Sequence, residues 1–230
     1  MKLLLTSAGI TNPSIEGALV DLLGRPVAEC TALCIPTAQY GHPMLDPVRT
    51  WRFVSGTSEL PMCGLGWRSL GVLELTALPD IPAERWVPWV READVLLVAG
   101  GDAAYLAHWV RRSGLADLLP SLTDTVWVGL SAGSMALTPR VGSQFVEWEA
   151  APGDETLGLV DFSICPHVNG DDRPGNTAAE AEAWISGLSN PGYVIDDDTA
   201  ITVVDGAVEV VSEGRWRRVE PQPGPAAPIG

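Results

Sequence analysis

The sequence predicts an α/β fold in three layers, with a mostly parallel sheet between helices and a C-terminal antiparallel hairpin. Three observations predict this fold class. Short, continuous apolar runs recur along the chain, segments of helical character separate them, and two further apolar runs flank an Asp-Gly pair near the end. Continuous apolar runs are typical of strands buried on both faces, and their alternation with helices is typical of a parallel sheet.

Six apolar runs are expected to form the buried strands, and three segments the best-defined helices. The strands cover residues 2–5, 32–35, 71–75, 95–98, 126–130 and 162–165. The helices cover residues 14–23, 103–112 and 177–188, and Thr177 stands where a hydroxyl can cap the last of them. Residues 200–204 and 207–211, joined by Asp205-Gly206, predict the hairpin, and residues 216–219 predict a further strand.

The composition indicates one folded domain. The chain has 230 residues, of which 46% are hydrophobic and 19% charged, enough apolar surface for a well-buried core. Residues 1–220 are expected to form this domain. The last ten residues, 221–230, contain four prolines and two glycines, so we expect them to form a loose tail.

The charge balance argues against nucleic-acid and membrane partners. The 14 basic and 29 acidic residues give a net charge of −15, which repels phosphate backbones and anionic lipids. The apolar start is too short for a signal peptide, and no run approaches the roughly 18 apolar residues of a membrane span. A cytoplasmic protein is therefore expected, as a monomer or homodimer.

No cofactor or metal is expected either. The four cysteines, Cys30, Cys34, Cys63 and Cys165, lack close metal-binding spacing and are interpreted as free thiols in a reducing compartment. The acidic clusters at residues 171–172 and 196–198 have no EF-hand spacing and no converging histidine. They are interpreted as solvated turns.

Ser131 is the candidate nucleophile. It lies in Gly129-Leu130-Ser131-Ala132-Gly133, which fits the G-x-S-x-G pattern of a nucleophile elbow, where glycines flank a serine in a tight strand-to-helix turn. A predicted strand comes directly before Ser131, and residues 134–137 can begin a helix. The alternative is an ordinary glycine-rich turn.

A serine nucleophile needs a base, and the chain has three histidines. His167 directly follows a predicted strand and Pro166, at the carboxyl edge of the sheet where Ser131 is also expected. His108 is interpreted as a residue of an amphipathic helix and His42 as a solvated loop residue. His167 is therefore the candidate base.

The third member should be a carboxylate that holds the imidazole tautomer. The segment between Ser131 and His167 supplies the candidates, which are Glu147, Glu149, Asp154, Glu155 and Asp161. Alternation places Glu147 and Glu149 on one face of an extended segment, and Glu147 is favoured.

Oxyanion stabilisation is expected from the N–H groups of Ala132 and of Gly100 or Gly101. The Gly100-Gly101 turn follows the predicted strand 95–98, and glycine allows a backbone donor to approach a substrate closely. An ordinary turn is the alternative.

Taken together, these residues resemble the peptidase E family of serine peptidases, whose fold is that of the class I glutamine amidotransferases. The resemblance rests on residues 3–7, 34–38, 99–102, 129–134, 166–167 and 196–201. It implies a Ser131–His167 dyad with an acid between them in sequence, and an oxyanion hole made by the Gly100-Gly101 turn and Ala132.

The chain departs from the family pattern in two places. The aspartyl dipeptidases that this chain resembles have an asparagine after the glycine turn, where this chain has Asp102. They also have an arginine about two helical turns after the histidine, which residues 176–182 lack. Asp102 and Arg173 are the remaining candidates for substrate binding. Because Asp171, Asp172 and the net charge oppose an anionic substrate, we expect a neutral or weakly polar first residue.

The expected function is a serine-type, dipeptidase-like exopeptidase that hydrolyses short peptides through a Ser131-His167-Glu147 triad and an acyl-enzyme. Two alternatives remain at this point. One is a serine hydrolase of the esterase type, which shares the G-x-S-x-G pattern. The other is a non-catalytic ligand-binding relative, because a fold does not guarantee an activity.

Overall fold

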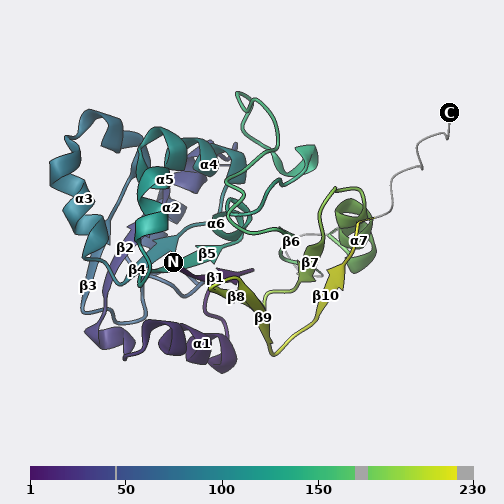
Figure 1. Ribbon diagram of the computed structural model, residues 1–230, viewed down its shortest axis with the longest axis horizontal. Coiled ribbons are helices and arrows are strands. Elements are labelled where there is room, and N and C mark those ends of the chain that lie inside the picture. Colours follow the sequence, from purple (N-terminus) through teal and green to yellow (C-terminus); the bar gives the residue numbers. More distant parts are fainter. Residues whose placement is uncertain (45, 169–175, 222–230) are drawn as a thin grey trace.

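A seven-stranded sheet lies at the centre of the computed structural model, which describes residues 1–44, 46–168 and 176–221. From one edge to the other, its strands are β3 (Ser69–Val72), β2 (Thr31–Ile35), β4 (Val95–Val98), β5 (Val126–Leu130), β1 (Lys2–Thr6), β8 (Thr199–Val204) and β9 (Ala207–Ser212). The first five run parallel, whereas β8 pairs antiparallel with both β1 and β9. The predicted mixed α/β sheet and its antiparallel hairpin are confirmed (Figure 1).

Helices cover both faces of this sheet. One core contains residues of α3 (Ala83–Arg91), α4 (Ala103–Arg112), α5 (Leu115–Leu118) and α6 (Ala132–Met135), and the other contains residues of α1 (Pro13–Leu23) and α2 (Pro47–Val54). In the strands between β3 and the far edge of the sheet, alternate side chains enter different cores. In β1, Leu3 and Leu5 enter the first and Leu4 the second. This double burial explains why the strands are continuously apolar in sequence.

A second, smaller sheet lies beside the hairpin (Figure 1). It consists of β6 (Ser163–Cys165), β7 (Gly192–Ile195) and β10 (Trp216–Val219), with β6 and β7 parallel, and α7 (Ala178–Ser186) packs against it. The assignment of residues 162–165 to the main sheet is therefore wrong. The hairpin strand β8 occupies the side of β1 where a further main-sheet strand would pair.

Local signals at helix ends and turns are confirmed. Thr177 forms the expected cap at the start of α7, as a capping box with Glu180. The structure adds a cap that was not predicted, in which the Asn12 side chain accepts a hydrogen bond from the Ile15 N–H at the start of α1. Asp205 and Gly206 have φ angles of 51° and 83°. Both angles are in the left-handed region that a two-residue hairpin turn requires.

The prediction of a buried strand at residues 71–75 is wrong, and the helices α2 and α3 were not predicted. The strand was expected at residues 71–75 but is exposed over most of its length, because it forms the edge of the sheet. The buried Leu75 that suggested a strand begins a 3₁₀ helix, Leu75–Asp80. Other 3₁₀ helices cover Val27–Glu29, Thr37–Gly41, Leu119–Ser121 and Ser143–Phe145.

The four cysteines are buried and form no disulfide with one another.

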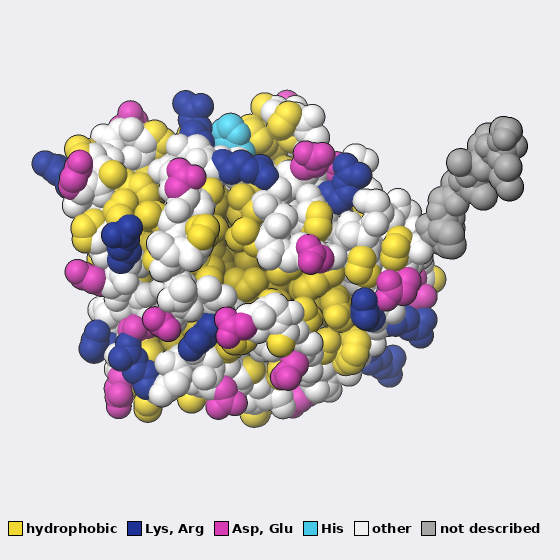
Figure 2. All heavy atoms as spheres, in the orientation of Figure 1, with side chains coloured by type: hydrophobic (Ala, Val, Ile, Leu, Met, Phe, Trp, Pro, Cys, Tyr) yellow, Lys and Arg dark blue, Asp and Glu magenta, His cyan; other side chains and the backbone are white. Residues whose placement is uncertain are grey.

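In the described parts of the chain, no helix combines the length and the apolar character needed to cross a membrane. Residues 222–230 of the expected tail lie outside the described residues. On the face shown in Figure 2, acidic and basic side chains surround an apolar hollow.

Candidate active site

Ser131 lies in the tight turn between β5 and α6. Its backbone has φ 50° and ψ −111°, a conformation that residues other than glycine adopt rarely. Such strain persists only where the surrounding structure enforces it, and it is concentrated at functional sites. The predicted strand–serine–helix context of the nucleophile elbow is thus present.

The glycines on either side of Ser131 are required by close packing. A Cβ on Gly129 would lie 2.6 Å from the backbone of Gly133, and one on Gly133 would lie 2.4 Å from the carbonyl oxygen of Val98. In addition, the Trp127 indole donates a hydrogen bond of 2.9 Å to the Gly133 carbonyl. These contacts hold the turn against β4 and β5 in its strained form.

The end of β1 holds the serine turn. The Ser131 N–H donates to the Thr6 carbonyl over 3.1 Å, and the Ser134 hydroxyl donates to the same oxygen over 2.8 Å. Ser7, the next residue along the chain, is fully buried. Its hydroxyl accepts a hydrogen bond of 2.8 Å from the His167 N–H. Two consecutive residues therefore fix the backbones of Ser131 and His167 near each other.

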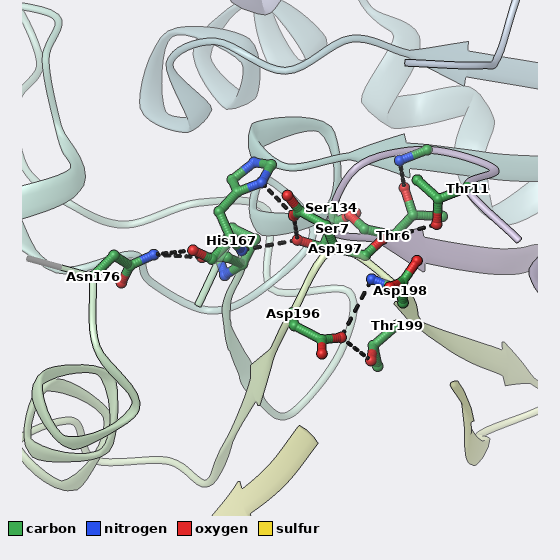
Figure 3. A network of polar contacts seen from close by, with 12 residues as sticks. Thr6, Ser7, Thr11, Ser134, His167, Asn176, Asp196, Asp197, Asp198 and Thr199 are labelled. Carbon is green, nitrogen blue, oxygen red and sulfur yellow. Dashed lines mark hydrogen bonds and ion pairs between the residues drawn. The ribbon is translucent and has the colours of Figure 1, made fainter. Parts of the chain in front are cut away.

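His167 is held by its backbone and its ring (Figure 3). It has a φ of 59°, and the Asn176 amide donates hydrogen bonds of 2.9 Å to the carbonyl oxygens of Pro166 and His167. The ring Nδ1 lies 2.6 Å from Asp197 Oδ1, and the Ser7 hydroxyl donates to that same oxygen over 2.7 Å. A carboxylate on Nδ1 favours the tautomer with a proton there, which leaves Nε2 as the basic nitrogen.

The carboxylate beside His167 is Asp197, not Glu147. Asp197 follows β7, and His167 follows β6. Because β6 and β7 are parallel neighbours, their carboxyl ends bring the two residues together. Glu147 lies on a different loop, where its N–H donates to the Asp102 carboxylate. Among the described residues, no hydrogen bond or ion pair joins Glu147 to His167.

The acidic run at residues 196–198 is accordingly more than a solvated turn. Asp196 Oδ1 accepts a hydrogen bond of 2.7 Å from the Thr199 hydroxyl, and its Oδ2 accepts one from the Arg215 N–H. These bonds fix the turn from which Asp197 projects toward His167 (Figure 3).

Asp102 has a structural role different from the expected substrate contact. It is fully buried and caps α4, where its Oδ1 accepts the Tyr105 N–H over 2.7 Å. Its Oδ2 accepts the N–H groups of Glu147 and Trp148 over 2.6 and 2.9 Å. Both carboxylate oxygens are thus used to attach the loop around residue 147 to the helix that follows the glycine turn.

The candidate oxyanion donors lie around Ser131. A Cβ on Gly100 would be 3.4 Å from the Ser131 Cβ, so the glycine turn lies against the serine. Ala132 begins α6, and its N–H has no acceptor within that helix. For the Gly101 N–H, the described parts of the chain supply no acceptor. These donors can therefore stabilise a negative oxygen beside Ser131.

Ser131 and the His167 ring are not hydrogen-bonded to each other in the described structure. Nucleophile and base are often separated in enzymes without substrate and move together when substrate binds. The other histidines lie elsewhere: the His108 ring packs against Trp109 and Trp148, and His42 Nδ1 accepts the Met44 N–H.

The predicted substrate-binding residue Arg173 and the expectation about a metal site are separate from this geometry. Arg173, with Asp171 and Asp172, lies outside the described residues. Within residues 1–44, 46–168 and 176–221, no group of three or more histidine, cysteine or acidic side chains is arranged to hold a metal ion.

Comparisons with known proteins identify a family. The model of peptidase family S51 matches residues 3–211. Peptidase E of Streptomyces coelicolor is 31% identical over 137 residues, which cover 56% of this chain and 50% of that protein. The alignment thus spans about half the length of this curated relative.

Solved structures show the same fold. A Listeria monocytogenes EGD-e protein assigned by name to peptidase E superposes with a TM-score of 0.69 at 19% identity, covering 93% of this chain and 98% of that chain. A peptidase from an acI-B1 actinobacterium gives a TM-score of 0.64 at 19% identity, with 96% and 91% covered. At these identities the likeness concerns the fold alone.

Proposed function

The chain belongs to peptidase family S51, and from that premise we propose that it is a serine peptidase acting on short peptides. In this proposal Ser131 is the nucleophile, His167 the general base and Asp197 the acid that orients the imidazole. Asp197 replaces Glu147 in the proposed triad.

The observation that carries the proposal is the Asp197–His167 contact of 2.6 Å on the same β1 end that anchors the strained Ser131 turn. A base oriented by a carboxylate, near a serine held in a strand-to-helix turn, is the arrangement that activates a hydroxyl nucleophile. If Ser131 served only to begin α6, the helix would need neither the strained backbone of Ser131 nor the hydrogen bonds of the buried Ser7 to His167 and Asp197.

The chemistry follows from these positions. The Ser131 oxygen attacks the scissile carbonyl carbon while His167 Nε2 takes the hydroxyl proton, and the N–H groups of Gly101 and Ala132 stabilise the oxyanion. Collapse breaks the C–N bond, and the imidazolium gives its proton to the leaving amine. Water then attacks the acyl-enzyme with His167 again as base, which releases the acid product and restores Ser131.

The proposed substrates are short peptides with a neutral or weakly polar first residue. The net charge of −15 opposes the approach of an anionic substrate. Asp102, which stands where the family has an asparagine, is engaged by three backbone N–H groups and is not available to a substrate. We keep a dipeptidase-like exopeptidase, active as a monomer or homodimer, as the specific form of the proposal.

The first test combines active-site labelling with activity. A fluorophosphonate probe should label the wild-type protein but not Ser131→Ala, and the substitution should remove nearly all peptide hydrolysis. His167→Ala should lower the rate by orders of magnitude, and the double variant should be little worse, because members of a triad act as a unit. His108→Ala is the matched control and should retain the wild-type rate.

Retention of more than about a tenth of the activity by Ser131→Ala or His167→Ala contradicts the assignment, since this corresponds to less than ~1.4 kcal/mol of transition-state stabilisation. Parallel panels of dipeptides, longer peptides and esters separate the alternatives. Hydrolysis of esters alone indicates an esterase, and a protein that is neither labelled nor active is a ligand-binding relative.

A further inference from the structure

A cavity of about 270 Å³ lies beyond the carboxyl ends of β2 and β3, apart from the candidate active site. Its lining includes Pro36, Tyr40, Pro47, Thr50, Trp51 and Glu74. The Tyr40 and Trp51 side chains are exposed, at 42% and 60%. The volume suits a group the size of a side chain, because sites for drug-sized ligands are generally larger.

Two oxygen atoms in this lining are buried and have no hydrogen-bond partner, Thr50 Oγ1 and Glu74 Oε2. Thr50 as a whole is only 6% exposed. A buried polar atom without a partner costs on the order of 1–3 kcal/mol. Both oxygens are closed to solvent behind the surface of the pocket, so a ligand reaches them only when the exposed Tyr40 and Trp51 rings turn aside, and partnering both oxygens would then recover this cost.

The Glu74 carboxylate is fixed in place by its other oxygen. Glu74 Oε1 accepts hydrogen bonds of 2.9 Å from the Thr37 hydroxyl, 3.1 Å from the Thr76 N–H and 3.0 Å from the Thr76 hydroxyl. All three donors are neutral. In the described parts of the chain no arginine, lysine or histidine forms an ion pair with Glu74.

The negative charge of Glu74 is felt by its aromatic neighbours. Burial first, and then the Glu74 charge, raise the pKa of the Tyr40 phenol. The pKa of Tyr105 is raised by burial, with Glu74 adding to the shift. A charge that acts on two neighbouring phenols and lacks a cationic partner creates a field that favours a positive ligand.

We infer that this cavity binds an organic cation, an ammonium or guanidinium group on a short apolar stem. The cationic N–H groups would meet Glu74 Oε2 and Thr50 Oγ1, and the stem would lie against Trp51 and Tyr40, whose ring faces also attract cations. A metal ion fits less well, because the lining supplies a single carboxylate and hard cations take several oxygen ligands.

The site is distinct from the proposed catalytic centre. Glu74 follows β3 and Ser131 follows β5, three strands apart in the order β3-β2-β4-β5, which corresponds to about 14 Å between strand ends. Cation binding therefore does not depend on the proposed peptidase function, and the two fail independently.

The experiment measures binding to the Ser131→Ala variant, in which turnover cannot interfere. Butylammonium and butylguanidinium are titrated by calorimetry, with 1-butanol and N-butylurea as neutral probes of similar shape. We expect at least one cation to bind tenfold or more tighter than its neutral counterpart. Adding Glu74→Gln should abolish this difference, whereas Glu29→Gln, at an exposed position outside the cavity, should leave it unchanged.

Thr50→Val provides a second variant that keeps the shape of the site. Because it removes a buried hydroxyl without a partner, it should leave the melting temperature equal or higher while weakening cation binding several-fold. If Glu74→Gln does not fold, Thr50→Val decides the result.

Several outcomes would overturn the inference. Equal binding of cations and neutral probes removes the cation preference, and unchanged binding in a folded Glu74→Gln variant removes the site. An equal loss in Glu29→Gln shows attraction by net charge only, and displacement of butylammonium by millimolar sodium or potassium shows an inorganic cation site. Titration with lysyl and arginyl peptide amides then distinguishes the two sources of the cation. Tight binding of these peptides indicates a basic side chain, and binding of butylammonium alone indicates a small free amine.

Discussion

At the scale of single residues, the buried Ser7 hydroxyl connects the parts of the candidate site. It accepts from the His167 N–H and donates to Asp197 Oδ1, so it fixes the proposed base and the proposed acid relative to β1. The preceding carbonyl, that of Thr6, fixes the Ser131 turn. Ser7 is a positioning residue, because its contacts are with the base and the acid.

The proposed acid gives a prediction about two carboxylates. Asp197→Asn should lower kcat by roughly 10³–10⁴-fold, because an amide beside Nδ1 no longer enforces the tautomer with a basic Nε2. Glu147→Gln should stay within about twofold of wild type, since among the described residues the hydrogen bond of Glu147 to Asp102 is made by its backbone N–H and not by its carboxylate. Steady-state kinetics on one peptide substrate, with circular dichroism to confirm folding, measures both.

The reverse order of effects would return the acid role to Glu147. Equal, small effects of both substitutions would show that the imidazole is oriented by the Ser7 and Asn176 contacts with its backbone rather than by a carboxylate.

Sequence patterns predict Ser131 and His167 as members of the candidate site, but not Asp197, the carboxylate that contacts His167. Ser131 was identified because its glycines are required by backbone packing, and such a requirement is visible in sequence. Asp197 lies outside the segment between Ser131 and His167, where the sequence predicts the acid. The signal that would have found it is the pairing of β6 with β7, and β7 was not recognised as a strand.

At the scale of elements, the Ser131 turn packs closely against β4. One methyl group added at Gly133 should therefore lower the free energy of unfolding strongly. Gly133→Ala would place a Cβ 2.4 Å from the Val98 carbonyl oxygen, so strand or turn must shift. We expect a loss of about 3 kcal/mol in the free energy of unfolding. Gly17→Ala, in the exposed middle of α1 with nothing within 4 Å, should instead stabilise by up to about 1 kcal/mol.

Chemical denaturation of both variants measures these changes. A Gly133→Ala variant as stable as Gly17→Ala would mean that the turn relaxes freely, and the enforced geometry of Ser131 would lose its support.

The amino ends of the central strands, at the opposite end from the candidate site, give a prediction about the pH dependence of stability. Asp94 precedes β4; its Oδ2 accepts the Thr31 N–H and hydroxyl over 2.7 and 3.0 Å, and it pairs with Arg25. Burial alone would raise the pKa of Asp94, but the hydrogen bonds from Thr31 and the charge of Arg25 lower it. The native state therefore binds this proton more weakly than the unfolded state.

This contribution to stability is complete above the unfolded pKa of about 3.9 and is lost as the pH falls through the lower native value. Asp94→Asn should cost about 1 kcal/mol at pH 7, and the difference from wild type should shrink between about pH 4 and 2. Asp117→Asn, at an exposed position, should cost nothing at either pH. Urea unfolding across this range is the measurement, and a constant Asp94→Asn difference would contradict the assignment.

The inner strands of the large sheet were predictable from their double burial, and the edge strand β9 from its Asp-Gly turn, whereas β3, α3 and β7 were not. β1, β2, β4 and β5 are continuous apolar runs because their side chains enter two cores. β3 is largely exposed, and α3 contains Pro88, so their sequences lack the pattern that burial or a regular helix imposes. The short β7 is buried but begins with Gly192 after Pro191, and a turn is the natural interpretation.

At the scale of the whole molecule, the candidate site lies where the two sheets meet. Ser131 and Ser7 follow strands of the seven-stranded sheet, whereas His167 and Asp197 follow strands of the smaller one. The backbone of Ser131 is fixed within the large sheet, and Ser7 is the described hydrogen-bond link from that sheet to the base. A relative movement of the two sheets would thus change the distance from Ser131 to the imidazole, and no hydrogen bond between these two groups is present among the described residues.

The net charge of −15 gives the last prediction, which concerns the sign of the salt effect on stability. Screening weakens the four described arginine–carboxylate pairs, each worth about 0–1 kcal/mol at the surface, but it also weakens the repulsion among the excess carboxylates. With more than twice as many acidic as basic residues, repulsion should dominate.

Raising sodium chloride from 0.01 to 0.15 M shortens the screening length from about 30 to 8 Å. At pH 7 we therefore expect the melting temperature to rise by about 2–4 °C. The same titration near pH 4.4, where the net charge is close to zero, should give no rise. A fall at pH 7 would show that the ion pairs outweigh the repulsion, and an equal rise at both pH values would assign the effect to a salt property other than screening.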